Sequence, residues 1–197
     1  NKLSFNPGYA GTNGAIFLVA MGRLQWMDFE GNPESFLFSI DGPSRPLQGG
    51  LGLTLIKDQL GNDRSFFARA AYSFHQPIGV GVLGIGIGAG MIQKTLVFNW
   101  LPPDGQASIG PDGSIPDAPE SSITYDLDFG IYYTTPKLYV GIASTHLPEQ
   151  DLSSNQMNFG VARHYFVLAG YTFDINSDIS IIPNVLVKSD AKSTIFD

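Results

Sequence analysis

The sequence predicts an all-β protein, namely an antiparallel transmembrane β-barrel of the outer-membrane type. Three observations lead to this fold class. Charged residues make up only 15% of the 197 residues, against about a quarter in soluble domains. Glycine is abundant, with 23 residues, and aromatic side chains account for 12%. Apolar residues also recur at every second position in run after run, which is the period of a β-strand.

About nine such runs follow one another along the chain, and turn-forming residues separate them. The predicted strands cover residues 14–26, 35–41, 49–57, 66–75, 76–93, 124–134, 137–145, 167–175 and 179–188. The turns include Asp41-Gly42-Pro43, Gly61-Asn62-Asp63, Thr135-Pro136-Lys137 and Asn176-Ser177-Asp178. Many runs have about the 9–11 residues that a tilted membrane strand needs. No segment predicts a helix.

The alternation has the same form in each of the clearest runs. The apolar positions are Ile16, Leu18, Ala20, Leu24 and Trp26 in the first run; Leu51, Leu53 and Leu55 in the third; Ala68, Ala70, Tyr72 and Phe74 in the fourth; Tyr125, Leu127, Phe129, Ile131 and Tyr133 in the sixth; and Val167, Ala169, Tyr171, Phe173 and Ile175 in the eighth. One face of each strand is therefore bulky and apolar, whereas the other is small or polar.

Residues 76–93 have the hydropathy of a membrane helix, because they carry no charge. Their pattern nevertheless predicts a strand. Glycines alternate strictly with larger apolar residues, at Gly84, Gly86, Gly88 and Gly90 against Leu83, Ile85, Ile87, Ala89 and Met91. A period of two would scatter these glycines around a helix, so the strand is favoured. The glycines form a smooth strip that a neighbouring strand or an internal plug could approach closely.

The composition of the two faces favours a barrel over a soluble β-protein, which is the alternative. A soluble sheet usually carries many Lys, Glu and Thr on its wet face. Here the small face holds mainly Gly, Ala, Ser and Thr with an occasional Arg or Asp. That suits a crowded barrel interior, with the bulky face toward lipid. Trp26, Tyr125 and Tyr133 lie at strand ends, as interfacial aromatic residues do.

Three parts of the chain differ in composition. Residues 1–13 are predicted to form an N-terminal periplasmic tail, a partner-contact segment or an internal plug, and residues 14–197 the barrel domain. Residues 101–121 hold five prolines and four acidic groups, so they form a loop. Long loops of outer-membrane barrels face outward, which predicts an extracellular position. The chain starts without a signal peptide, which is also how an exported protein looks after cleavage.

Candidate chemistry is sparse, and we expect no catalytic, cofactor or metal site. Eighteen acidic groups against 11 basic ones, with a net charge of −7, argue against nucleic acid as a partner. The absence of cysteine excludes thiolate chemistry. Residues 79–84 fit GxGxxG, but strand residues follow them where a dinucleotide site needs a helix. His75, His146 and His164 lack metal-site spacing, and Ser144, His146 and Asp151 have no specific triad spacing.

Two groups of residues are the candidate sites. The opening Asn6, Pro7, Gly8, Tyr9, Ala10 and Gly11 is polar and glycine-rich, and no predicted strand satisfies its backbone groups, so it could bind a partner or a plug site. The second group is a lumenal polar network of Arg23, Gln25, Arg69, Asp126 and Asp128. Asp126 and Asp128 share one strand face, about 7 Å apart, where Arg23 or Arg69 could pair with them.

Several short motifs occur in the order and spacing of one known family. They are Asn6-Pro7-Gly8-Tyr9-Ala10-Gly11-Thr12-Asn13-Gly14, Arg23-Leu24-Gln25-Trp26, Gly31-Asn32-Pro33, Phe38-Ser39-Ile40-Asp41-Gly42-Pro43, Gly50-Leu51-Gly52-Leu53, Asp58-Gln59-Leu60-Gly61, His164-Tyr165-Phe166, Ala169-Gly170-Tyr171 and Ile182-Pro183-Asn184-Val185-Leu186-Val187-Lys188. Together they resemble the PorP/SprF family, outer-membrane proteins of the type IX secretion system of Bacteroidetes. The resemblance runs along essentially the whole chain.

This resemblance implies a non-enzymatic outer-membrane barrel of the secretion and gliding machinery. It would support secretion or surface anchoring of large adhesins. Its partners would be periplasmic ring lipoproteins of the system, a secreted adhesin and outer-membrane lipid. A passive porin or small-ligand transporter is the alternative. The chain departs from the family pattern at Gly8, where Ala is more frequent. Because family members extend further and barrels have even strand numbers, we expect C-terminal strands beyond the nine.

Overall fold

The computed structural model describes residues 1–29, 31–97, 120–153 and 158–196, and this part of the chain is all-β. A short 3₁₀ turn, Pro7–Tyr9, precedes the strands. The strands are β1 (Phe17–Leu24), β2 (Glu34–Ser44), β3 (Gly49–Leu60), β4 (Asp63–Ile78), β5 (Gly81–Leu96), β6 (Glu120–Thr134), β7 (Leu138–Thr145), β8 (Gln150–Ser153), β9 (Asn158–Val161), β10 (His164–Tyr171), β11 (Phe173–Asp174), β12 (Ser180–Ile181), β13 (Asn184–Ser189) and β14 (Thr194–Phe196). Among these residues, no helix has the length and apolar character to cross a membrane.

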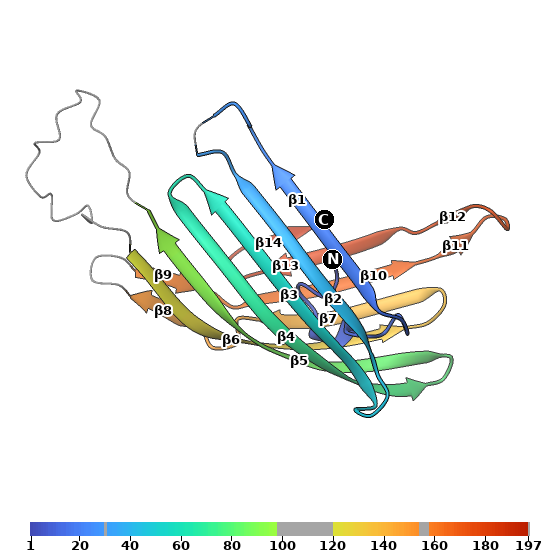
Figure 1. Ribbon diagram of the computed structural model, residues 1–197. Coiled ribbons are helices and arrows are strands. Elements are labelled where there is room, and N and C mark those ends of the chain that lie inside the picture. The colour runs from blue at the N-terminus through green and yellow to red at the C-terminus, as the bar shows by residue number, and fades with distance from the viewer. Residues whose placement is uncertain (30, 98–119, 154–157, 197) are drawn as a thin grey trace, which may run out of the picture.

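Ten of these strands form one antiparallel sheet, in the order β1-β2-β3-β4-β5-β6-β7-β10-β13-β14. Two hairpins, β8–β9 and β11–β12, extend from the connections of this meander. The sheet curls around the N-terminal segment (Figure 1), with β1 and β14 as its two open edges. The predicted antiparallel all-β fold is confirmed, and the curled sheet is consistent with a barrel, although it is not closed.

The two faces of the sheet have opposite polarity. Directly paired residues of an antiparallel sheet lie on the same face, and one continuous row runs Ser39, Thr54, Arg69, Gly90 and Asp126 from β2 to β6. We call the face with this row the inner face. Eight of its polar side chains are buried, namely Ser39, Asp41, Thr54, Arg69, Ser73, Asp126, Asp128 and Thr145.

The outer face carries the bulky side chains of the alternation. Its exposed residues include Leu18, Phe36, Phe38, Leu53, Phe66, Phe74, Ile85, Ile87, Tyr125, Leu127, Phe129, Val140, Ile142 and Val167. Few hydrophobic side chains are buried by comparison, among them Leu3, Ile92, Tyr132 and Leu168. The fold is therefore polar inside and apolar outside, the reverse of a soluble domain.

The connections divide the sheet into two rims. Residues 25–33, 97–119 and 146–163 connect strands at one end, which we call the long-loop rim. The short turns 45–48, 79–80 and 135–137 lie at the other end, the short-turn rim, together with the β11–β12 hairpin. The chain enters β1 from the short-turn rim. The predicted loop 101–121 lies outside the described residues, apart from Glu120 and Ser121, which begin β6.

Most strand positions agree with the sequence pattern, but the predicted strands 76–93, 167–175 and 179–188 are each divided between two strands. The predicted strand 76–93 is divided, since β4 ends at Ile78 and β5 begins at Gly81. Gly79 adopts φ +58°, the left-handed conformation that glycine allows. A turn inside a glycine-rich run has no composition of its own, so alternation could not reveal it. The β8–β9 hairpin and the short β14 were also not predicted.

Candidate functional site

The N-terminal segment is seated on the inner face of the sheet, and we call residues 1–13 the plug segment (Figure 1). Its contacts reach β2 through Asp41, β4 through Ser73, β6 through the Ile131 carbonyl and β10 through Phe166. One short segment can contact strands so far apart only because the sheet is strongly curved. Of the possibilities that the sequence left open, an internal plug is the one that this placement favours.

Asn6 is the centre of the plug segment and is fully buried. Its Oδ1 accepts a hydrogen bond from the Gly8 backbone N–H at 2.9 Å, which caps the 3₁₀ turn. Its Nδ2 donates to the carbonyl oxygens of Ile131 at 3.1 Å and Ile142 at 3.3 Å. A single amide side chain thus fixes the turn and attaches it to both β6 and β7.

Glycines of the sheet make room for this turn. A Cβ atom at Gly84 or Gly86 would overlap the backbone of Pro7 and Gly8. The reverse also holds, because a Cβ atom at Gly8 would lie 2.9 Å from the carbonyl oxygens of Gly84 and Gly130. The prediction that the glycine strip permits close approach is confirmed at Gly84 and Gly86.

Polar groups of two strands, β2 and β4, hold the backbone of the plug segment. The Gly11 N–H donates to Asp41 Oδ2 at 2.8 Å, and Ser73 Oγ donates to the Gly8 carbonyl at 2.9 Å. His75 Nε2 lies 2.9 Å from the Ala10 carbonyl, so this nitrogen carries the proton. Sequence reasoning missed these contacts, because their partners are backbone atoms that leave no motif.

An apolar contact and a group of aromatic rings complete the contacts that hold the plug segment on the inner face. Leu3 and Ala10 pack against Ala71 with Tyr9 beside them. The Lys2 ammonium lies 3.2 Å from the ring centroid of Tyr139, and it donates to Tyr132 Oη at 3.1 Å. Burial lowers the pKa of Lys2 below its ordinary value. The cation–π contact offsets part of the cost of desolvating this charge.

An ionic cluster lies on the inner face beside the plug segment. Arg69 Nε lies 2.5 Å from Asp128 Oδ2, and Arg69 Nη2 lies 3.4 Å from Asp126 Oδ2. Arg69 Nη1 also donates to the Ser4 carbonyl at 2.7 Å, so Arg69 connects strand β4 to the plug segment. Gly88 and Gly90 lie between the strands of these residues, and a Cβ atom at Gly88 would meet the Asp128 carboxylate at 2.9 Å. The strip therefore also makes room for the ion pairs.

His146 belongs to this cluster, which the sequence did not predict. Its Nδ1 lies 3.0 Å from Asp126 Oδ1, and its backbone N–H donates to Asp128 Oδ1 at 3.2 Å. The ring contacts the His164 ring with centroids 5.7 Å apart. His146 follows the end of β7 with φ +56°, and this left-handed turn directs the backbone back toward β6. Alternation alone carries no signal for such a residue.

The predicted network is brought together only in part. Arg69, Asp126 and Asp128 meet as described. Arg23 lies on the inner face of edge strand β1, opposite Ser35, where it is exposed, and Gln25 follows that strand. Among the contacts of the described residues, neither Arg23 nor Gln25 reaches the aspartates. That Arg23 and Gln25 belong to this network stays a prediction.

The structure separates the other candidate groups. Ser144 pairs with Phe129 on the outer face, whereas His146 faces the aspartates, so the two do not form a nucleophile–base pair. The side chain of Asp151 lies outside the described residues. Residues 79–84 form a turn and the start of β5, with no helix for a pyrophosphate. Within the described part of the chain, no three His, Cys, Asp or Glu side chains are placed to bind a metal.

The fold and its filled interior define a class of protein. An antiparallel sheet with an apolar outer face and a polar inner face is the arrangement of a β-type membrane protein. The family model of the type IX secretion system membrane protein PorP/SprF matches residues 1–197, the whole chain. The chain therefore belongs to the PorP/SprF family and is a membrane component of the type IX secretion system. No curated protein and no solved structure matches it.

Proposed function

We propose that this chain is a non-enzymatic outer-membrane barrel component that holds protein partners of the type IX secretion system. In this role it supports the secretion or surface anchoring of large adhesins. The observation that carries the proposal is the buried plug segment. Asn6, Pro7 and Gly8 pack on the glycines of the inner face, where a porin would leave a water-filled channel. A barrel whose interior is filled by its own chain is suited to holding partners at its rims.

The two rims suggest how partners are divided between the two sides of the membrane. Short turns of outer-membrane barrels face the periplasm and longer loops face outward. On that rule the plug segment enters from the periplasmic side, where the ring lipoproteins would bind. The long-loop rim, with loop 101–121, would face the exterior and the adhesin. Residues 1–13 and 14–197 then act as plug and barrel of one outer-membrane unit.

A partner can contact the predicted residues only on one condition. These residues are Asn6, Pro7, Gly8, Tyr9, Ala10 and Gly11. Most of these residues are buried against the inner face, so a partner would first have to draw the segment out. By contrast, Asn13 at the end of the plug segment and Gly14 directly after it are exposed. We propose that a periplasmic partner binds first at this exposed end.

The test uses the full chain, purified and reconstituted in planar bilayers. We expect little steady conductance from the unchanged chain, and a clear increase for Asn6→Ala. That variant leaves the buried carbonyls of Ile131 and Ile142 without their donor, at a cost of about 1–3 kcal/mol. Asn184→Ala is the matched control, since Asn184 is exposed on β13. The control should behave like the unchanged chain.

Pull-downs from native envelopes with the same three proteins provide the second measurement. The unchanged chain and Asn184→Ala should recover ring lipoproteins of the secretion system. Steady conduction by the unchanged chain, together with no recovered envelope protein, would support a passive porin or small-ligand transporter instead. Ser144→Ala should leave secretion and adhesion unaltered, because no base faces this hydroxyl among the described residues.

A further inference from the structure

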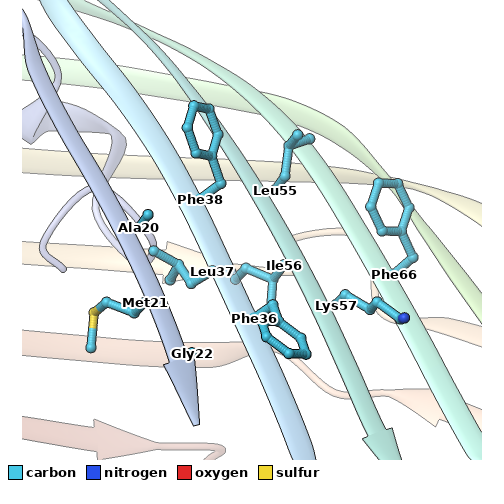
Figure 2. A pocket seen from close by; sticks show the side chains of 10 residues that line it. All are labelled: Ala20, Met21, Gly22, Phe36, Leu37, Phe38, Leu55, Ile56, Lys57 and Phe66. Atoms are coloured by element: carbon cyan, nitrogen blue, oxygen red, sulfur yellow. The ribbon is translucent and has the colours of Figure 1, made fainter.

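The outer face has a hollow beside the edge strand β1. Small residues of β1, Ala20 and Gly22, lie next to a row of large side chains on β2, β3 and β4 (Figure 2). The cavity has a volume of about 460 Å³. Its outer-face walls are formed by Phe36, Phe38, Leu55, Lys57 and Phe66. The hollow is therefore an apolar groove with one cationic group in its wall.

Lys57 is the unusual member of this wall. The pairing of β2, β3 and β4 places it between Phe36 and Phe66 on the outer face, and it is exposed. Within the described part of the chain no acidic side chain forms an ion pair with it. A lysine on a lipid-facing surface is costly unless its ammonium reaches the headgroup region. An anionic partner at this position would remove that cost.

A second cation lies one step closer to the long-loop rim. Arg64 pairs with Gln59, the outer-face residue that follows Lys57 on β3. Lys57 and Arg64 are thus diagonal neighbours on one face, about 7–8 Å apart at their backbones. Glu34 pairs with Gln59 from the other side, so the polar row also includes one acidic group. Below this row, toward the middle of the strands, the groove is apolar.

We propose that this groove binds one phosphate-bearing anionic lipid of the outer leaflet, the leaflet in which the proposed orientation places the long-loop rim. Its phosphate is held by Lys57 and Arg64, and an acyl chain lies between β1 and the side chains of Phe36, Phe38 and Phe66. The order of groups matches the ligand, since cations lie toward the rim and the apolar hollow lies deeper. The proposal rests on the membrane function proposed above, and it adds a specific lipid to a surface that otherwise contacts bulk lipid.

The test uses the full chain in nanodiscs that contain equal parts of phosphatidylglycerol and phosphatidylcholine. Native mass spectrometry then measures which lipids stay bound after the disc is removed. We expect preferential retention of phosphatidylglycerol. Lys57→Met keeps an apolar side chain of similar length and should reduce that preference about fivefold, because a cation near an anionic lipid surface contributes about that much. Lys57→Arg should retain it.

Two further variants separate the charge from the groove. Lys192→Met removes an exposed cation from the turn between β13 and β14 on the same rim and should change nothing. Ala20→Leu fills the hollow without altering charge and should lower retention of phosphatidylglycerol. Equal retention of both lipids by the unchanged chain, or an unaltered preference in Lys57→Met, would overturn the lipid site.

The remaining outcomes distinguish this site from the proposed membrane function. If excess inorganic phosphate displaced the lipid, the site would be a plain anion site and the proposal would be wrong. Failure of the chain to enter nanodiscs at all would overturn both proposals. Normal insertion with no lipid preference would overturn the lipid site alone.

Discussion

On strand β5, the two faces of one backbone have opposite surroundings. Its inner positions are Gly84, Gly86, Gly88 and Gly90, and all four lie against backbone or ionic side chains. Its outer positions include Ile87, which is 60% exposed. A soluble sheet would bury the isoleucine face and expose the other. Here the inner positions are small because space is limited, while the outer positions are apolar because they face lipid.

The comparison shows that the small residues on the inner face of β5 have two uses. Gly84 and Gly86 admit the backbone of the plug segment, whereas Gly88 leaves space beside the ion pairs of Arg69 and Gly90 lies against the backbone of β4. Both uses require polar groups to come close without side chains between them. The outer face has no such requirement, so its residues vary freely among large apolar types. We expect the inner face to tolerate substitution least.

The largest expected effect is on the inner face, at Arg69. Arg69→Met leaves Asp126 and Asp128 buried without their cation. We expect the free energy of unfolding to fall by about 3–5 kcal/mol, the usual cost of breaking a buried ion pair from one side. Urea titration in lipid vesicles, followed by heat-modifiable gel mobility, measures it. Arg23→Met, at an exposed edge position, should change stability by less than about 0.5 kcal/mol.

A further variant tests the cause of this loss. Adding Asp126→Asn and Asp128→Asn to Arg69→Met removes the unpaired charges and should restore part of the stability. If the combined variant were no more stable than Arg69→Met alone, lost packing would be the cause. An equal loss in Arg23→Met would instead place Arg23 within the network.

The outer face carries the next largest effect. Phe129 lies on β6 and is 41% exposed. Phe129→Arg places a charge in the lipid-facing band, and we expect a loss of about 2–4 kcal/mol in the same vesicle titration. Ile123→Arg, on the same strand and face but nearer the long-loop rim, should cost only about 0–1 kcal/mol. Equal costs at both positions would contradict a lipid-facing band with a polar boundary.

The sequence predicts the strands and their faces well, but little of the plug contacts. Alternation identifies which residues of β5 and β6 share a face, because each face of a strand meets a single environment, lipid or barrel interior, along its whole length. It therefore placed Asp126 and Asp128 on one face, but it left Arg23 and Arg69 as equal candidates for their partner, and only Arg69 contacts them. The seat of Asn6 depends on the carbonyls of Ile131 and Ile142, which any residue type supplies. The position of His146 depends on its positive φ, which residue periodicity does not encode.

The smallest expected effect comes from one methyl group placed on either side of the sheet. A Cβ atom at Gly8 would lie 2.9 Å from the carbonyl oxygens of Gly84 and Gly130, and backbone atoms cannot move aside easily. We expect Gly8→Ala to cost about 1–3 kcal/mol, as overpacking does in a tight interior. The cost should be lower if the plug segment shifts as a unit, and bilayer conductance would then rise.

Gly22→Ala is the matched control, because it adds the same methyl group on the outer face of β1. There the new atom would lie 3.3 Å from the Phe36 ring, a side chain with room to turn away. Its cost should be under about 0.5 kcal/mol, with no change in conductance. A harmless Gly8→Ala, with stability and conductance both unchanged, would mean that the plug segment is held less tightly than its contacts indicate. The inner face would then owe its small residues to the ion pairs of Arg69 alone.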